Sequence, residues 1–262
     1  MTIKTKALSL PDASIIVGIV LLLSFLIIII SMPSLTINTL KHWDREAMLT
    51  LNGSQGRWMD QFWYAFSSFK TWIVAMIFII VTIWNTCKGT TRQKLIFILC
   101  FILLFVVLDQ TSSSLIKPWI ARPRPSHDPL IGPLLHYVNG YHGGRYGFVS
   151  GHATNITGLV TWLCLIYRQP KARLCFILFG IALCFSRIYL GVHYPGDIIC
   201  GALLGFIIAR IAFRIVSNYF QFDHSHKPYT LLAVIGGTIV CLFVYAGIQA
   251  LSPFSGLLQI LH

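Results

Sequence analysis

A histidine and an aspartate stand out in this sequence because the apolar segments around them carry very few charges. In the stretch SRIYLGVHYPGD, His193 is followed four residues later by Asp197. A carboxylate that reaches one nitrogen of an imidazole fixes the tautomer of the ring and makes the other nitrogen a better nucleophile. The spacing therefore predicts that His193 is a nucleophile and that Asp197 supports it.

A second histidine opens another apolar segment. His152 follows Ser150 and Gly151 in the stretch FVSGH. At the beginning of a helix, free backbone N–H groups and the helix dipole favour a bound anion. No carboxylate lies near His152 in the sequence, so we expect it to act as a proton donor rather than as a second nucleophile.

Three basic side chains stand near the same apolar boundaries. Lys117 and Arg124 lie in the stretch KPWIARPRP, and Arg187 precedes His193 by six residues. The planar guanidinium group of arginine suits the paired oxygens of a phosphate. With one histidine as nucleophile and another as acid, the set has the groups that cleavage of a phosphate ester requires.

The segments that must position these residues are strongly apolar. Hydrophobic residues make up 56% of the 262 residues and charged residues only 11%, whereas about a quarter of the residues in soluble domains are charged. Because about 20 helical residues cross the hydrocarbon core of a bilayer, we expect an all-α polytopic membrane protein formed by one domain, 1–262. Its spans are predicted at 13–32, 70–86, 95–114, 149–167, 174–190, 197–216 and 229–250.

Lysine and arginine positions predict the orientation. The short turns 87–94 and 167–173 carry six of these residues and no acid between them, which favours the cytoplasmic side. The amino terminus is then cytoplasmic, and the three polar clusters lie together on the opposite side. The net charge of +12 is spread over loops at membrane boundaries, so we expect anionic head groups as partners and no nucleic acid. The seven cysteines form no CxxC pair, which argues against disulfides and a zinc site.

These three clusters resemble the motifs of the PAP2 superfamily, the type 2 phosphatidic acid phosphatases. The family pattern is a lysine, six residues and Arg-Pro; then Pro-Ser-Gly-His; then Ser-Arg, five residues, His, three residues and Asp. Lys117 with Arg124-Pro125 matches the first motif, and Ser186-Arg187 with His193 and Asp197 matches the third. The second departs from the pattern at Val149, where proline is usual. The match extends over about 95–216.

The resemblance implies a six-helix membrane core, to which the span at about 229–250 is extra. It also implies that His193 forms a phosphohistidine supported by Asp197, and that His152 protonates the leaving group and later activates water. The implied phosphate-binding residues are Lys117, Arg124, Ser150, Gly151 and Arg187. No metal or other cofactor is implied.

The predicted function is that of an extracytoplasmic lipid phosphatase in a bacterial inner membrane, with undecaprenyl diphosphate or a lipid A phosphate favoured as substrate. Two alternatives remain open: a lipid phosphotransferase that uses the same histidine, and a non-catalytic carrier of lipid phosphates. The oligomeric state is not predicted.

Several other residues receive structural interpretations. Arg122 and Arg145 are interpreted as membrane-boundary anchors. Asp109, within a predicted span, is expected to pair with nearby polar groups rather than to react. The segment 33–69 is expected to form two interfacial helices with aromatic anchors. For the loop 126–147, both a lid and a simple connection stay open.

Overall fold

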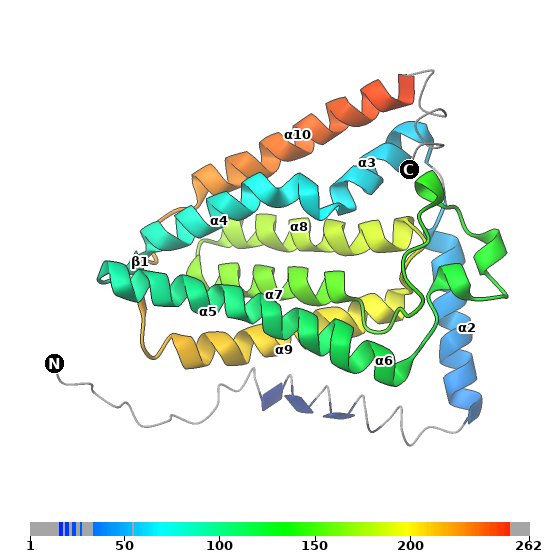
Figure 1. The fold of residues 1–262 in the computed structure, drawn as a ribbon, viewed down its shortest axis with the longest axis horizontal. Helices are drawn as coiled ribbons and strands as arrows, with labels where there is room; N and C mark the ends of the chain where they lie inside the picture. The colour runs from blue at the N-terminus through cyan, green and yellow to red at the C-terminus, as the bar shows by residue number, and fades with distance from the viewer. Residues whose placement is uncertain are drawn as a thin grey trace.

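In the computed structural model of the protein, residues 34–53 and 55–251 are described, together with isolated positions between 16 and 27. They form a bundle of helices that run side by side, with α2 lying across one end (Figure 1). The longer helices are α2 (Ser34–Leu51), α3 (Arg57–Ser67), α4 (Ile73–Thr86), α5 (Thr91–Asp109), α7 (Gly151–Ile166), α8 (Pro170–Tyr189), α9 (Pro195–Val216) and α10 (Tyr229–Leu251).

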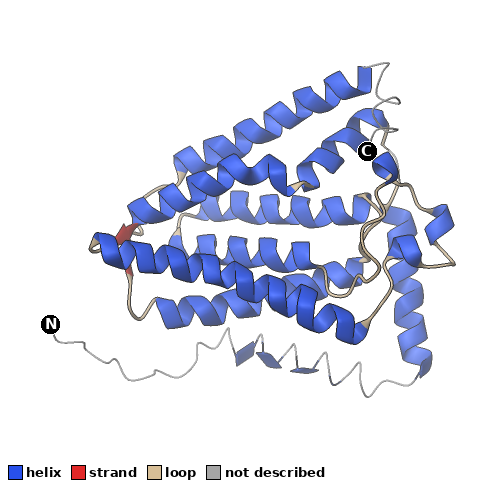
Figure 2. Cartoon of the chain, viewed as in Figure 1, coloured by secondary structure: helices blue, strands red, loops and turns tan. Residues whose placement is uncertain are grey.

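Short elements join these helices. A helical turn, α6 (Lys117–Ile120), follows α5, and single 3₁₀ turns occupy Phe69–Trp72, Pro125–His127, Gly132–Leu134 and Val138–Gly140. The strands β1 (Cys87–Lys88) and β2 (Gln221–Phe222) pair antiparallel at the end of the bundle far from α2 (Figure 2). This pairing ties the α4–α5 turn to the segment that follows α9.

The all-α polytopic membrane fold expected from the sequence is confirmed. Within the described residues, five helical segments are long and apolar enough to cross a membrane: Phe69–Thr86, Thr91–Ile120, Pro170–Tyr189, Pro195–Ser217 and Tyr229–Leu251. The predicted span 149–167 corresponds to α7, whose 16 residues are fewer than the roughly 20 that cross a bilayer alone. The predicted span 13–32 lies outside the continuously described residues.

Helices α7 and α9 pack closely because glycines line their contact. A Cβ atom at Gly205 would lie 2.2 Å from the carbonyl oxygen of Thr154, and one at Gly201 would lie 2.6 Å from that of Ser150. Small residues four positions apart let two helix backbones approach within a membrane protein. This contact sets the distance between the helix that carries His152 and the helix that carries Asp197.

Helix α5 continues into α6 through a π-helical segment, Gln110–Ile116. Such segments insert extra residues into a helix and are common at functional sites. Here the segment brings Ser113 and Lys117 to the beginning of α7. A Cβ atom at Gly151 would lie 3.0 Å from Ser113 Oγ and 3.9 Å from Lys117 Nζ, so the glycine is needed where these two helices meet.

The segment 33–69 does contain two helices, but their aromatic side chains do not all face outward. Trp43 is exposed, whereas Trp63 is partly buried and contacts Phe185 of α8 edge to face. On the other face of α3, Trp58 Nε1 donates a hydrogen bond of 3.0 Å to the Phe243 carbonyl of α10. Helix α3 is therefore a packed part of the bundle as well as a boundary element.

Candidate active site

The three polar clusters meet at the end of the bundle near α6 and α2 (Figure 1). The first cluster follows α5, the second begins α7, and the third connects α8 to α9. Lys117, Arg124 and Arg187 all act electrostatically on both His193 and His152, and His193 also acts on His152. The geometry therefore brings together residues that are up to 80 positions apart in the chain (Lys117 to Asp197).

His193 is enclosed, with only 1% of its surface exposed. Burial, followed by the positive charges of Arg124, Arg187 and Lys117, holds the pKa of His193 well below its usual 6.5. The ring is consequently neutral at physiological pH, which is the state that a nucleophile requires. Its Nδ1 atom lies 3.5 Å from Asp197 Oδ2, so the opposite nitrogen, Nε2, is the one left to attack.

Asp197 is fully buried in the first turn of α9. Its Oδ2 atom accepts a hydrogen bond of 3.1 Å from the backbone N–H of Tyr194, and its Oδ1 atom accepts one of 2.9 Å from Arg122 Nη1. The separation of 3.5 Å from His193 is longer than an ordinary hydrogen bond. In this structure the carboxylate is therefore held mainly by Tyr194 and Arg122, at a position adjacent to the His193 ring.

The interpretation of Arg122 as a simple boundary anchor is wrong. Its guanidinium group bridges two carboxylates, Asp197 and Asp44, at 2.9 and 2.6 Å, and lies 4.1 Å from the centre of the Tyr194 ring. Asp44 also accepts a hydrogen bond of 2.8 Å from the backbone N–H of Gly196. Arg122 and Asp44 thus attach α2 to the turn that carries Asp197, a pairing that spacing along the chain could not reveal.

Arg187 is held by two residues that sequence reasoning missed. Its side chain is buried, and it donates hydrogen bonds to Ser67 Oγ and, at 3.2 Å, to Tyr141 Oη. Its Nε atom has no hydrogen-bond partner among the described residues. A buried guanidinium N–H without a partner is costly, and an anion in the site would supply that partner.

Arg124 is held by the backbone of the loops around it. Its Nε donates to the Tyr146 carbonyl at 3.1 Å and its Nη1 to the Val192 carbonyl at 3.2 Å. Burial and the neighbouring charge of Arg187 lower the pKa of Arg124 below its usual 12.5. Two arginines this close repel each other, and a bound phosphate would relieve that repulsion.

Ser150 and Gly151 form the beginning of α7, as expected. Ser150 is the N-cap residue, and its hydroxyl accepts a long hydrogen bond of 3.4 Å from the Ala153 N–H. Its backbone N–H donates to the Asp197 carbonyl at 3.1 Å. Val149, which replaces the usual proline, is buried against Cys200 and Leu204 of α9, so this departure is accommodated by apolar packing.

His152 faces a cavity of about 230 Å³. The residues that line the cavity include Arg187 and the two residues that hold it, Ser67 and Tyr141. His152 itself is exposed, in contrast to the enclosed His193. One imidazole is therefore fixed inside the bundle, and the other faces the space through which a substrate and water reach it.

Two other expectations concern nearby segments. Ser113 Oγ donates to Asp109 Oδ1 at 3.3 Å, which confirms that Asp109 pairs with the local serine run. The loop 126–147 is more than a connection: Tyr141 binds Arg187, and a Cβ atom at Gly147 would lie 2.7 Å from Asp197 Oδ2. The end of this loop therefore forms one wall of the site.

The fold and the converging clusters define a membrane phosphatase of the PAP2 class. A sequence model described as the PAP2 superfamily matches residues 95–221, and a lipid A 4′-phosphatase is 38% identical to the chain over 72% of its own length; the chain belongs to this superfamily. Family membership and the phosphatases among its relatives identify the protein as an integral membrane enzyme that hydrolyses phosphoric monoesters.

Similar proteins include two lipid A 4′-phosphatases. The protein of Porphyromonas gingivalis is 38% identical over 172 residues, which cover 66% of this chain and 72% of that protein. The protein of Bacteroides thetaiotaomicron is 31% identical over 163 residues, which cover 62% and 72%. A crystal structure of a transmembrane PAP2-type phosphatidylglycerolphosphate phosphatase from Bacillus subtilis shares the fold, with a TM-score of 0.59 over 81% of this chain and all of that one at 17% identity.

Proposed function

We propose that this enzyme removes a phosphate group from a membrane lipid through a phosphohistidine intermediate on His193. The observation that carries the proposal is the enclosed, neutral His193, with a carboxylate oxygen 3.5 Å from its Nδ1 atom and three cations around it. A neutral imidazole within a cationic cup is suited to attack a phosphorus atom whose oxygens the cations hold.

In the first step, the lipid phosphate lies between Lys117, Arg124 and Arg187, with the N–H groups at the beginning of α7 as further donors. His193 Nε2 attacks phosphorus, so that a P–N bond forms while the P–O bond to the lipid breaks. The negative charge of the bound phosphate offsets that of the three cations, so that His152 carries a proton, which it transfers to the departing oxygen. Asp197 stabilises the positive charge that develops on the His193 ring.

In the second step, His152 has lost its proton and acts as a base. It takes a proton from a water molecule, whose oxygen attacks phosphorus and breaks the P–N bond. Inorganic phosphate leaves, and both histidines return to their starting states. Exposure of His152 to the cavity, in contrast to the enclosed His193, supports this division of roles.

A lipid A phosphate is the substrate that we favour, and undecaprenyl diphosphate is the second choice. The support is that two lipid A 4′-phosphatases are 31–38% identical over more than 60% of the chain. The orientation proposed from the basic turns 87–94 and 167–173 places the site at the extracytoplasmic face of a bacterial inner membrane. There, the lipid's tails remain in the bilayer while its phosphate enters the cup.

The experiment is phosphate release from a panel of lipid A, undecaprenyl diphosphate and phosphatidic acid by the purified enzyme. His193→Ala is expected to abolish phosphate release. With a lipid whose phosphate is radiolabelled, it is also expected to abolish the label that stays on the protein after rapid quenching. His152→Asn is expected to slow release, while His127→Ala, at an exposed position, serves as the matched control. Equal rates for the native enzyme and His193→Ala would refute the proposal, and label found in a second lipid instead of free phosphate would indicate a phosphotransferase.

A further inference from the structure

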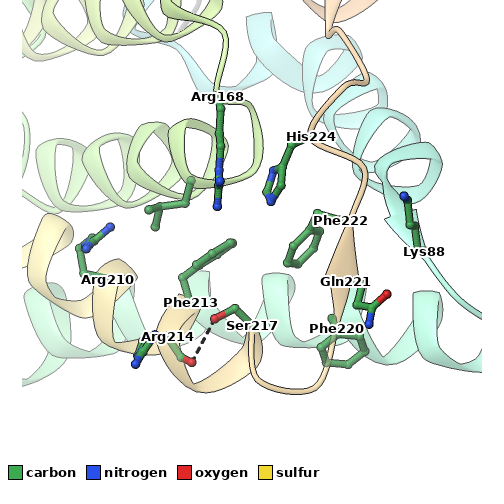
Figure 3. A pocket seen from close by; sticks show the side chains of 11 residues that line it. Lys88, Arg168, Arg210, Phe213, Arg214, Ser217, Phe220, Gln221, Phe222 and His224 are labelled. Carbon is green, nitrogen blue, oxygen red and sulfur yellow. Dashed lines mark hydrogen bonds between the residues drawn. The ribbon is translucent and has the colours of Figure 1, made fainter. Parts of the chain in front are cut away.

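A second basic pocket lies at the opposite end of the bundle from His193. It has a volume of about 550 Å³ and lies beside the β1–β2 pairing and the carboxyl-terminal ends of α7 and α9 (Figure 3). The cationic side chains that line it are Lys88, Arg168, Arg210 and Arg214, with His224 beside Arg168.

The charged side chains that line this pocket are basic. None of the described residues that line it is acidic. The carboxylate nearest to these residues in the sequence, Asp223, accepts hydrogen bonds from the N–H and hydroxyl of Ser225 at 3.0 and 2.6 Å and also interacts electrostatically with Lys88. A lining of four basic side chains without an acidic one is complementary to an anionic group.

The walls of the pocket are held in place by hydrogen bonds. His224 Nδ1 lies 2.8 Å from the Ile166 carbonyl oxygen, and because a carbonyl can only accept, Nδ1 carries the proton. Gln169 Nε2 donates to the His224 and His226 carbonyls at 3.0 and 3.1 Å. These contacts attach the segment after β2 to the α7–α8 turn, so the basic groups come from segments that are fixed relative to one another.

An apolar crevice of about 770 Å³ continues from this pocket along α7, α8 and α9. The two cavities share Leu165 and Arg210. Most of the crevice surface is contributed by aliphatic and aromatic side chains, among them Val160, Ile177 and Phe206. A cationic pocket that opens into an apolar crevice is complementary to an amphiphile with an anionic head and a hydrocarbon chain.

The pocket is separate from the active site. Arg214 follows Asp197 by 17 residues on α9, which corresponds to about 25 Å along a helix. This distance is close to the thickness of the hydrocarbon core. A ligand in the basic pocket would therefore lie at the other membrane boundary from the phosphate that His193 attacks.

We propose that the basic pocket binds the phosphate-bearing head group of an anionic membrane lipid, with an acyl chain in the apolar crevice. The lipid belongs to the leaflet opposite the active site and is bound without being hydrolysed. A phosphodiester lipid such as phosphatidylglycerol satisfies both parts of the site. This proposal does not depend on which way the protein is oriented or on which lipid the active site hydrolyses.

The test measures binding of phosphatidylglycerol to the detergent-purified protein by native mass spectrometry, with phosphatidylcholine as the uncharged comparison. Arg168→Gln combined with Arg214→Gln is expected to weaken phosphatidylglycerol binding about thirtyfold, because each cation near a membrane surface contributes about fivefold. The matched control, Arg92→Gln combined with Lys171→Gln, removes the same charge from exposed positions on the same end of the bundle and is expected to bind normally.

Further measurements identify which site and which ligand give rise to the observed lipid binding. Arg124→Gln, which alters the active site, should leave this binding unchanged; if it abolishes the binding, the lipid occupies the active site and the proposal fails. Inorganic phosphate should compete weakly; if it binds as tightly as the lipid, the site is for free phosphate and the lipid proposal is wrong. Equal binding by the pocket variant and its control would also overturn it. If the double variant does not fold, Arg168→Gln alone, at an exposed position, gives the same comparison.

Discussion

The α7–α9 contact offers a sharp test of how the active site is positioned. In Gly205→Ala, the new Cβ would lie 2.2 Å from the Thr154 carbonyl oxygen, about 1.2 Å short of ordinary contact at 3.4 Å. The oxygen belongs to the α7 backbone and the position of the Cβ atom is fixed by the α9 backbone, so rotation of a side chain cannot relieve the clash. Helix α7 must move away from α9, and His152 moves with it relative to His193 and Asp197.

The expected effect on catalysis is large. A misplacement of about 1 Å between reacting groups costs on the order of 100-fold in rate, and overpacking of this kind costs about 1–3 kcal/mol of stability. Gly201→Ala, where the Cβ would lie 2.6 Å from the Ser150 carbonyl oxygen, should have the same kind of effect but a smaller one. The assay is phosphate release from a short-chain lipid phosphate, with thermal unfolding measured in the same detergent.

Gly236→Ala is the matched control because, outside the neighbouring backbone of α10 itself, no atom of the described residues lies within 4 Å of the position of its Cβ. Since alanine is the better helix former, this variant is expected to be fully active and no less stable than the native enzyme. The reasoning would be refuted if Gly205→Ala kept native activity, or if Gly236→Ala lost as much activity as Gly205→Ala.

Arg122→Gln is expected to lower the free energy of unfolding by about 3 kcal/mol, because it leaves the buried Asp197 without its charged partner. Arg145→Gln should change this free energy little, and chemical unfolding of both variants measures the difference. The acid limb of kcat/KM is expected below pH 6.5, because burial and nearby cations lower the pKa of His193 and a lower pKa keeps the ring neutral to lower pH. A pH profile whose acid limb, corrected for substrate ionisation, lies above 6.5 would contradict this. Asp109→Asn should retain most of its turnover because Asp109 pairs with a local serine; loss of turnover in a folded variant would show a catalytic role.

Composition and spacing alone determined the broad character of the protein. The low charge content and the apolar segments predicted a helical membrane protein, and the offsets between His193 and Asp197 and between Lys117 and Arg124 predicted a phosphate site. These signals are local. The apolar segment beside a residue shows that the residue lies near a helix end, and a motif of 12 residues or fewer can be recognised within one stretch of the chain.

Only the tertiary structure decided which groups hold the reacting residues. Arg122 is one boundary arginine among several in the sequence, yet its guanidinium bridges Asp197 to Asp44 of a helix more than 70 residues away. Likewise, Ser67 and Tyr141 approach Arg187 only because α3 and the loop 126–147 fold over the end of α8. Such contacts depend on how closely the helices pack. At the α7–α9 contact, glycines set this distance because they let the backbones approach each other. A periodic pattern within one segment contains no information about the distance to another segment.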